Sequence, residues 1–251
     1  MWAKLKKSRL RPFLLKLWAI GDQLYPKHLG VPPTNVPLLV HEALLILEDL
    51  GEKEKGVLLD IGGRNAPYRK QLSRLASRYI CLDIEPGEMQ RVQIIGDALR
   101  LPIRNSSIKV AVLFEVLEHL REPHQATHEI ARILAPNGLL LVTAPQYWHI
   151  HGWPSDYFRF TNHGLMYLCQ QVGFDVVKMW RRGGPCILLS LVMVNTFNLN
   201  GDPLRRVFIG VPLTWVCYVL DSIFFSTMED RKNPDTRGWA LIARKPPNNT
   251  A

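Results

Sequence analysis

An acid and two adjacent glycines follow an apolar run early in the chain. The run 57–59 leads into Asp60 and then into Gly62 and Gly63. A second apolar run, 79–82, ends at Asp83, about 23 residues after Asp60. Glycines let a backbone approach a ligand closely because they carry no Cβ. A carboxylate at the end of a neighbouring strand can accept from both hydroxyls of a ribose diol. The spacing therefore predicts a pocket for a nucleoside.

A second group of chemically active residues lies in the stretch 146–161. His149 and His151 stand there among aromatic side chains, with Asp156 and Arg159 close behind. Because neutral imidazole removes protons near neutral pH, we expect His151 to act as a general base, with His149 as the second candidate. Asp156 and Arg159 are expected to pair and brace the loop. We expect no metal, because two histidines and one acid in a loop are a common combination.

Alternating strands and helices must position both groups. Apolar runs predict strands at 57–61, 79–82, 110–114, 139–145, 174–180 and 238–245, and periodic patterns predict helices at 37–50 and 124–134. This alternation predicts a parallel sheet with right-handed crossovers. Ligands bind such sheets at the carboxyl ends of the strands, which is where both groups lie.

Further markers continue the pattern: 96–102 (GDALRLP), 117–119 (LEH) and the turn 136–138 (PNG). In order and spacing these residues resemble a class I S-adenosylmethionine-dependent methyltransferase of the methyltransferase type 11 sort, over roughly 55–180 plus a last strand. The resemblance implies an α/β, Rossmann-like doubly wound sheet of seven strands, with the last antiparallel and a helical insertion before it. Two residues depart from the family's frequent pattern. Arg64 stands where a further glycine is common, and Lys109 stands where aspartate is common.

The resemblance also implies S-adenosylmethionine as the cofactor and assigns residues to its parts. The implied cofactor contacts are Asp60 for the methionine ammonium, Gly62 and Gly63 for close backbone approach, Asp83 for the ribose, Ile84 for the adenine face, Asp97 and Ala98 for the adenine edge, and Phe114 and Glu115 at the pocket mouth. Glu118 is expected on a helix surface. A structural role is expected for His119.

The formal charge of +9 and the isoelectric point near 9.5 imply an anionic partner. The basic residues cluster in a leader and linker, 1–36, together with an apolar stripe at helical spacing from Leu10 to Trp18. This leader is expected either to cap the pocket or to lie in a lipid interface. Nucleic acid is not an expected partner, because the charges follow no groove and an NPPY-type motif is missing.

The predicted methyltransferase domain spans 37–246 and contains a hydrophobic helical insertion at 183–236. Its apolar runs are 186–194 and 207–220. The first run is too short to span a bilayer, and the flanking strands belong to one sheet, so we expect a lid, a dimer contact or an interfacial hairpin. Four scattered cysteines and the lack of a secretory signal predict a cytoplasmic protein. The leader and the insertion together predict that it docks as a peripheral protein at the inner face of the membrane.

The sequence thus predicts methyl transfer to oxygen on a small or lipid-linked acceptor. A sugar acceptor is suggested because 150–161 is similar to methyltransferases of bacterial surface-polysaccharide and glycolipid pathways. One alternative is a non-catalytic, membrane-associated binding protein that retains the fold. An NAD-dependent oxidoreductase is disfavoured by the lack of a GxGxxG motif. The acceptor and the oligomeric state stay open.

Overall fold

The computed structural model describes residues 36–51, 55–87, 91–199, 205–224 and 235–247. The chain divides into two compact units. One comprises Asn35–Arg182 and Gly238–Ala251, and the other includes Gly183–Arg237. The predicted leader, 1–36, lies almost wholly outside the described residues.

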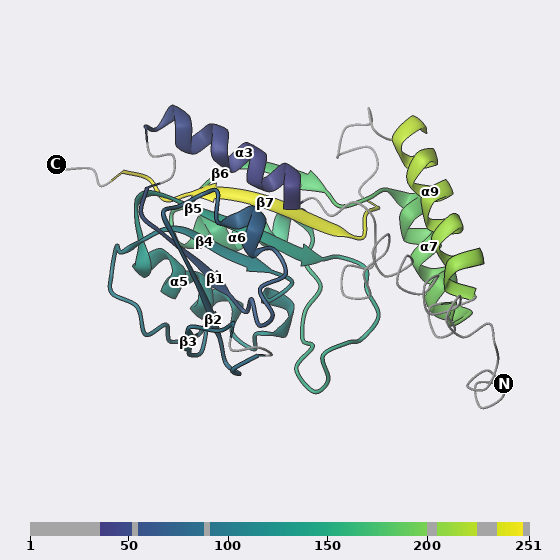
Figure 1. The fold of residues 1–251 in the computed structure, drawn as a ribbon, viewed down its shortest axis with the longest axis horizontal. Coiled ribbons are helices and arrows are strands. Elements are labelled where there is room, and N and C mark those ends of the chain that lie inside the picture. The colour runs from purple at the N-terminus through teal and green to yellow at the C-terminus, as the bar shows by residue number, and fades with distance from the viewer. Residues whose placement is uncertain (1–35, 52–54, 88–90, 200–204, 225–234, 248–251) are drawn as a thin grey trace, which may run out of the picture. The chain divides into compact units, whose positions relative to one another are not determined.

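The first unit is built on a seven-stranded sheet (Figure 1). Its strands are β1 (Val57–Ile61), β2 (Arg78–Asp83), β3 (Ile94–Ile95), β4 (Ile108–Phe114), β5 (Leu134–Pro145), β6 (Asp175–Arg181) and β7 (Gly238–Arg244). Their order is β3-β2-β1-β4-β5-β7-β6, and β7 runs antiparallel to both of its neighbours. The predicted seven-stranded sheet with an antiparallel last strand is therefore confirmed.

Helices cover both faces of this sheet. On one face α3 (Val36–Asp49) and α4 (Arg69–Leu72) pack against residues such as Leu58, Val110 and Ile242. On the other face α5 (Pro123–Ile133) and α6 (Asn162–Gln171) pack against the alternate strand positions, such as Leu59 and Ala111. Side chains alternate between faces along a strand, so apolar runs without polar interruptions are required where both faces are buried.

The element bounds follow the predictions closely, with one difference at β5. We predicted its start at 139, after a turn at 136–138, whereas the strand begins at Leu134. Leu134 pairs with Ile108, and the register shifts before Val110 pairs with Leu139. Pairing with β4 therefore draws the turn residues into an irregular first section of the strand.

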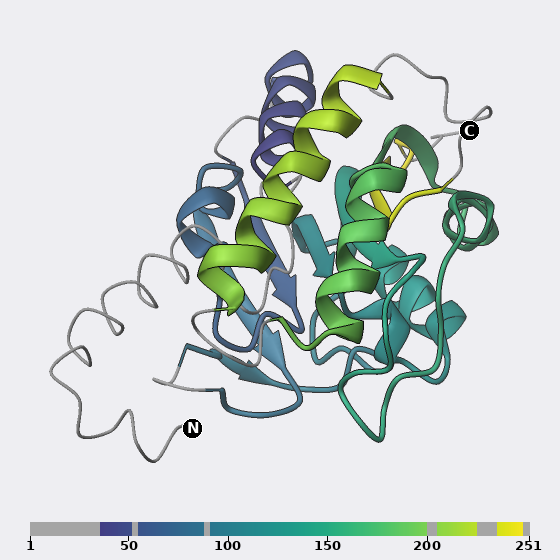
Figure 2. The same ribbon diagram turned by 90° about the vertical axis from the view of Figure 1, so that its right-hand side faces the viewer.

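The second unit is helical where it is described. It contains α7 (Pro185–Thr196), the short π-helical turn η3 (Arg206–Gly210) and α9 (Val211–Phe224), and Figure 2 shows α7 and α9 side by side. The buried carboxylate of Asp221 on α9 accepts hydrogen bonds from the backbone N–H groups of Gly184, Cys186 and Ile187 at 2.9 Å each. These donors belong to the first turn of α7, which has no helical acceptors for them, so Asp221 fastens one helix to the other. In the described part of the chain, no helix combines the length and apolar character that a membrane crossing needs.

Candidate functional site

The glycine turn after β1 is fixed by its backbone conformation. Gly62 has a φ of +74°, and a Cβ on it would lie 2.6 Å from Val116 Cγ2. Its N–H donates to the Leu82 carbonyl at 2.7 Å. Both the left-handed φ and the close approach exclude a larger residue at this position. Arg64, two residues on, also has a positive φ, of +35°, although it is not glycine.

Asp83 joins this turn to the end of β2. Its Oδ2 accepts from the Arg64 N–H at 3.0 Å, and its Oδ1 accepts from the Glu85 N–H at 3.2 Å. An ionised carboxylate offers about four acceptor positions, so both oxygens can still accept from a ligand. Above it, the side chains of Arg64 and Glu85 form an ion pair at 2.7 Å on the exposed rim.

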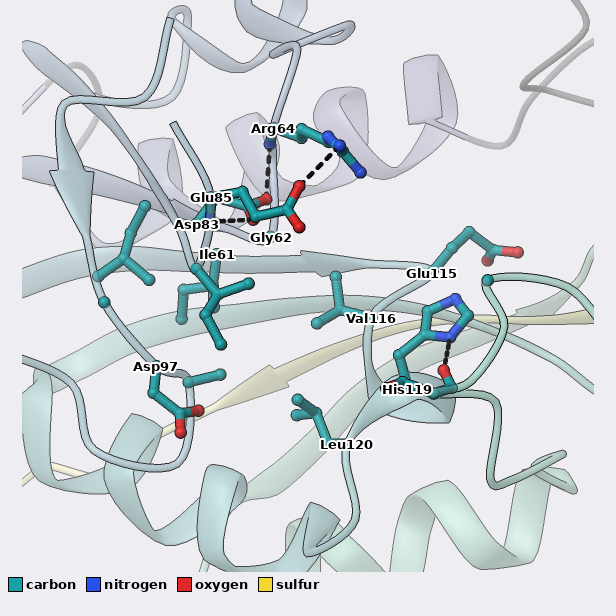
Figure 3. Close-up of a pocket in the computed structure, with 16 residues that line it drawn as sticks. Ile61, Gly62, Arg64, Asp83, Glu85, Asp97, Glu115, Val116, His119 and Leu120 are labelled. Atoms are coloured by element: carbon teal, nitrogen blue, oxygen red, sulfur yellow. Dashed lines mark hydrogen bonds and ion pairs between the residues drawn. The ribbon is translucent and has the colours of Figure 1, made fainter. Parts of the chain in front are cut away.

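A cavity of about 410 Å³ opens between this turn and the segments that follow β3 and β4. Six of the predicted cofactor residues line it: Gly62, Asp83, Ile84, Asp97, Ala98 and Glu115. In Figure 3, Asp97 lies on one side of the cavity, and Glu115 and His119 lie on the other. The volume falls within the range of about 300–1,000 Å³ that is usual for ligand pockets.

The lining fits an adenosine group. Ile84 is 68% exposed, so it offers the cavity an apolar surface suited to a flat base. Asp97 also lines the cavity, and its Oδ1 accepts from the Leu99 N–H at 2.9 Å and so holds its own turn. With Asp83 able to accept from two hydroxyls and Gly62 admitting close backbone contact, the residues present match the parts of S-adenosylmethionine.

Three predicted cofactor residues, Asp60, Gly63 and Phe114, do not line the cavity. Asp60 is buried beneath the turn, where its Oδ2 accepts from the Tyr79 hydroxyl. Burial raises the pKa of Asp60 to about 6, although the Tyr79 hydrogen bond opposes this. A Cβ on Gly63 would meet the Asp60 Oδ2 at 2.7 Å. Asp60 therefore supports the turn from below, and its contact with the methionine ammonium stays a prediction.

Sequence reasoning missed several lining residues. These are Ile61, Arg64, Leu82, Glu85, Gly96, Val116, His119, Leu120, Gly152 and Ser155. Most of them end a strand or directly follow one, and that position was the available signal. Gly152 and Ser155 come from the stretch 146–161, which was predicted to hold the general base.

Asp156 and Arg159 brace that loop, as predicted. The Arg159 guanidinium donates to both Asp156 oxygens, at 2.6 and 2.8 Å, and to the His149 carbonyl at 3.0 Å. Asp156 also accepts from the His151 N–H at 2.8 Å. The Arg159 hydrogen bonds hold the pKa of Asp156 far below its usual range. One bidentate ion pair thus fixes the backbone on both sides of Gly152.

The two predicted bases do not line the cavity, whereas His119 does. The His151 ring packs edge-on against His119, with their centroids 4.7 Å apart. His119 follows β4 on the short turn η2 (Leu117–His119), and its Nδ1 lies 2.5 Å from the Ser155 carbonyl. A Cβ on Gly152 would lie 2.7 Å from His119 Cε1, so a glycine is needed where the loop crosses this ring. A catalytic role for His151 stays a prediction.

The expectation that Glu118 lies on a helix surface is wrong. Its side chain is fully buried, and its backbone carbonyl accepts from the N–H groups of Tyr157 and Phe158. The distant loop therefore covers the turn that carries Glu118. Burial, followed by repulsion from Glu115, raises the pKa of Glu118 to about 8. Neither carboxylate oxygen has a hydrogen-bond partner within the described residues.

Comparison with known proteins agrees with this fold. Residues 59–142 match the family described as "Methyltransferase domain". An uncharacterized methyltransferase of Mycobacteroides abscessus is 22% identical over 124 residues, which are 42% of this chain and 48% of that protein. A Mycolicibacterium smegmatis protein, named as a probable S-adenosylmethionine-dependent methyltransferase, is 32% identical over 82 residues, 30% of this chain and 32% of that one. The chain spans half or less of the length of these relatives.

Solved structures share the fold at low sequence identity. The [4+2]-cyclase SpnF is 20% identical, with a TM-score of 0.52 over 83% of this chain and 81% of that one. A chain in the complex of the Haloferax volcanii Trm112 methyltransferase activator is 16% identical, with a TM-score of 0.53 over 86% of this chain and 96% of that one. Residues 59–142 thus match a methyltransferase domain, and the strand order and the solved structures show the corresponding fold. The residues that line the cavity fit S-adenosylmethionine as its ligand.

Proposed function

We propose that this protein transfers the methyl group of S-adenosylmethionine to an oxygen of a small or lipid-linked acceptor, such as a sugar. The observation that carries the proposal is one cavity lined both by Asp83, the predicted partner of the ribose diol, and by Glu115 and His119. A donor with its ribose on Asp83 and its base against Ile84 directs its remaining part toward Glu115 and His119. When bound, the cofactor supplies an activated methyl on a sulfonium, so positioning is the larger part of catalysis.

The loop around Gly152 supports an acceptor site next to that methyl. Gly152 and Ser155 line the cavity, and the exposed aromatic side chains of Trp153 and Tyr157 follow in the same loop. Aromatic surfaces of this kind suit a sugar ring or a lipid headgroup. A hydroxyl acceptor loses a proton during transfer, and we assign its removal to the neighbouring histidines, with His151 as the first residue to test.

The test supplies S-adenosylmethionine labelled in its methyl group to the full chain, together with fractionated cell extract. The label should enter a lipid or glycan fraction, and mass spectrometry should place it on oxygen. His151→Ala should lower turnover while donor affinity stays within about twofold, whereas the exposed His128 on α5 serves as the matched control. Donor binding without transfer to any fraction would instead favour the alternative, a binding protein that retains the fold.

We also propose that the second unit docks on an anionic membrane surface. Its helices expose large apolar side chains, including Leu189, Val192, Phe208, Ile223 and Phe224. The net charge of +9 and the basic leader favour an anionic leaflet, where each Lys or Arg contributes about 1 kcal/mol. Apolar insertion adds a part that salt does not screen.

Vesicle flotation tests this docking with phosphatidylglycerol-containing and purely zwitterionic vesicles. Binding should be stronger to the anionic vesicles and should weaken, without vanishing, at high salt. The double change Phe208→Ser and Phe224→Ser should weaken it, whereas Leu45→Ser, at an exposed site on α3 in the other unit, should not. Equal binding to both vesicle types, or none, would make the apolar helices a lid or a dimer contact.

A further inference from the structure

Two histidines converge on one buried carboxylate oxygen beside the cavity. The Nε2 atoms of His119 and His151 each lie 3.9 Å from Glu118 Oε1. One ligand atom from each of the three residues lies within 4.8 Å of the other two. Glu118 is completely buried, and among the residues that the structure describes nothing donates to either of its oxygens.

The other ring nitrogens fix the tautomers. His119 Nδ1 lies 2.5 Å from the Ser155 carbonyl, which can only accept, so Nδ1 carries the proton. His151 Nδ1 faces two acceptors, the His149 carbonyl at 3.3 Å and the Asp156 Oδ2 at 3.4 Å. In the neutral rings both Nε2 atoms therefore present lone pairs toward Glu118.

When Glu118 is ionised, this arrangement leaves three electron-rich atoms facing one another with no donor between them. A carboxylate in a buried site is strongly destabilising unless a positive group or hydrogen-bond donors compensate it. The nearby guanidiniums of Arg182 and Arg159 act on Glu118 only through space, because they form their ion pairs with Glu115 and Asp156. A cation held by all three atoms removes that conflict. Backbone carbonyl and carboxylate partners on the distal nitrogens are the support that metal-binding histidines ordinarily have.

We propose that Glu118, His119 and His151 bind a divalent transition-metal ion, with zinc as the reference case. Two imidazoles and one carboxylate form a common zinc set that leaves a coordination position open. Ligand atoms around tetrahedral zinc lie about 3.3 Å apart. The two histidine–Glu118 separations of 3.9 Å would therefore shorten by roughly half an ångström, and the widest separation, up to 4.8 Å, by up to about 1.5 Å. The sequence-based expectation of no metal considered His149, His151 and Asp156 and so passed over Glu118 and His119, which belong to a different segment.

The position of His119 gives the ion a use in the proposed function, and this step rests on that function. Because His119 lines the cavity, the ion lies at the cavity wall and can take the acceptor hydroxyl as its open ligand. In this form His151 acts as a ligand and not as the base, so it contributes to proton removal through the ion. Coordination would lower the pKa of the hydroxyl, and its proton would leave to water. The oxygen then attacks the methyl carbon, the C–O bond forms as the C–S bond breaks, and neutral S-adenosylhomocysteine departs.

Metal binding is measured on the full chain after treatment with a chelator. Titration with Zn²⁺ by calorimetry, and with Co²⁺ by visible absorption, should show saturable binding of one ion per chain. His119→Ala, His151→Ala and Glu118→Gln should each weaken binding by more than tenfold, and His128→Ala should not change it. Thermal unfolding of each metal-free variant checks that the fold persists, and Glu118→Gln keeps the shape of the side chain.

Two results would overturn the site: no saturable binding by the wild-type chain, or unchanged binding when His119 and His151 are both replaced. The site and the proposed function can fail separately. Specific metal binding without methyl transfer would keep the site and reject the function. Methyl transfer by a chain that binds no metal would keep the function and reject the site.

Discussion

Replacement of Asp83 by alanine should disrupt donor binding more than any other single truncation in the cavity. In the wild-type chain the carboxylate accepts from the Arg64 and Glu85 N–H groups and keeps acceptor positions for a diol. Alanine removes the hydrogen bonds to the backbone and those to the diol at once. The donor loses its ribose partner, and the glycine turn loses its tie to β2.

The magnitude follows from the two hydroxyl bonds. Hydrogen bonds to a charged group contribute about 1.5–3 kcal/mol each, so a loss of roughly 3–6 kcal/mol is the upper range. Water replaces part of this, because Asp83 is only half-buried. We therefore expect at least a tenfold loss of affinity, or about 1.4 kcal/mol. Asp83→Asn keeps one acceptor oxygen, so its affinity for the donor should lie between those of the wild type and of Asp83→Ala.

Calorimetric titration with S-adenosylhomocysteine measures the effect. Asp175→Ala is the matched control, because Asp175 is an exposed acid on β6 outside the cavity. It makes the same charge change and should leave affinity within about twofold. Near-wild-type affinity in Asp83→Ala, with an unchanged unfolding temperature, would refute the assignment of the ribose to this residue.

Three further changes test the structure around the site and the second unit. Gly62→Ala should lower the free energy of unfolding, measured with urea, by about 1–3 kcal/mol because of its positive φ and by more because of the clash with Val116. Gly51→Ala is the control: its φ is +65° but it has open space, so it should lose stability only through backbone strain. Asp60→Asn should change the pH dependence of stability, because the raised pKa of Asp60 means that the folded wild-type chain binds more protons than the unfolded chain between about pH 4 and 6. The free energy of unfolding of the wild type should therefore fall by up to about 3 kcal/mol as pH rises through that window. Urea unfolding at about pH 4 and pH 6 should show this fall in the wild type and not in the variant. Asp221→Ala removes three acceptors from the first turn of α7, and amide hydrogen exchange there should accelerate by more than tenfold; unchanged protection would show that apolar packing alone holds the helix.

The sheet could be predicted because each strand is a local pattern. Continuous apolar runs such as 57–59 and 110–114 are required where both faces of a strand are buried, and the acids and glycines that end them mark the ligand edge. Asp83, Asp97 and Glu115 line the cavity. They could be predicted because the position of a residue relative to the end of a strand can be seen in the local sequence.

The histidine–carboxylate cluster could not be predicted in the same way. Glu118 is polar and lies on a short turn, so the local sequence predicts that it lies on the surface. Its burial depends on backbone bonds from Tyr157 and Phe158, nearly forty residues later in the chain. The contact of Asp60 could not be predicted either, because the pairing of β1 with β2 brings its partner Tyr79 to it. Spacing along the chain gives no measure of such contacts.

The most direct test of the whole account is calorimetric titration of the full chain with S-adenosylmethionine and, separately, with NAD⁺. We predict saturable binding of one S-adenosylmethionine per chain, lost with Asp83→Ala, and no binding of NAD⁺. Absence of S-adenosylmethionine binding, or its displacement by NAD⁺, would contradict the assignment of this cavity to a methyl donor.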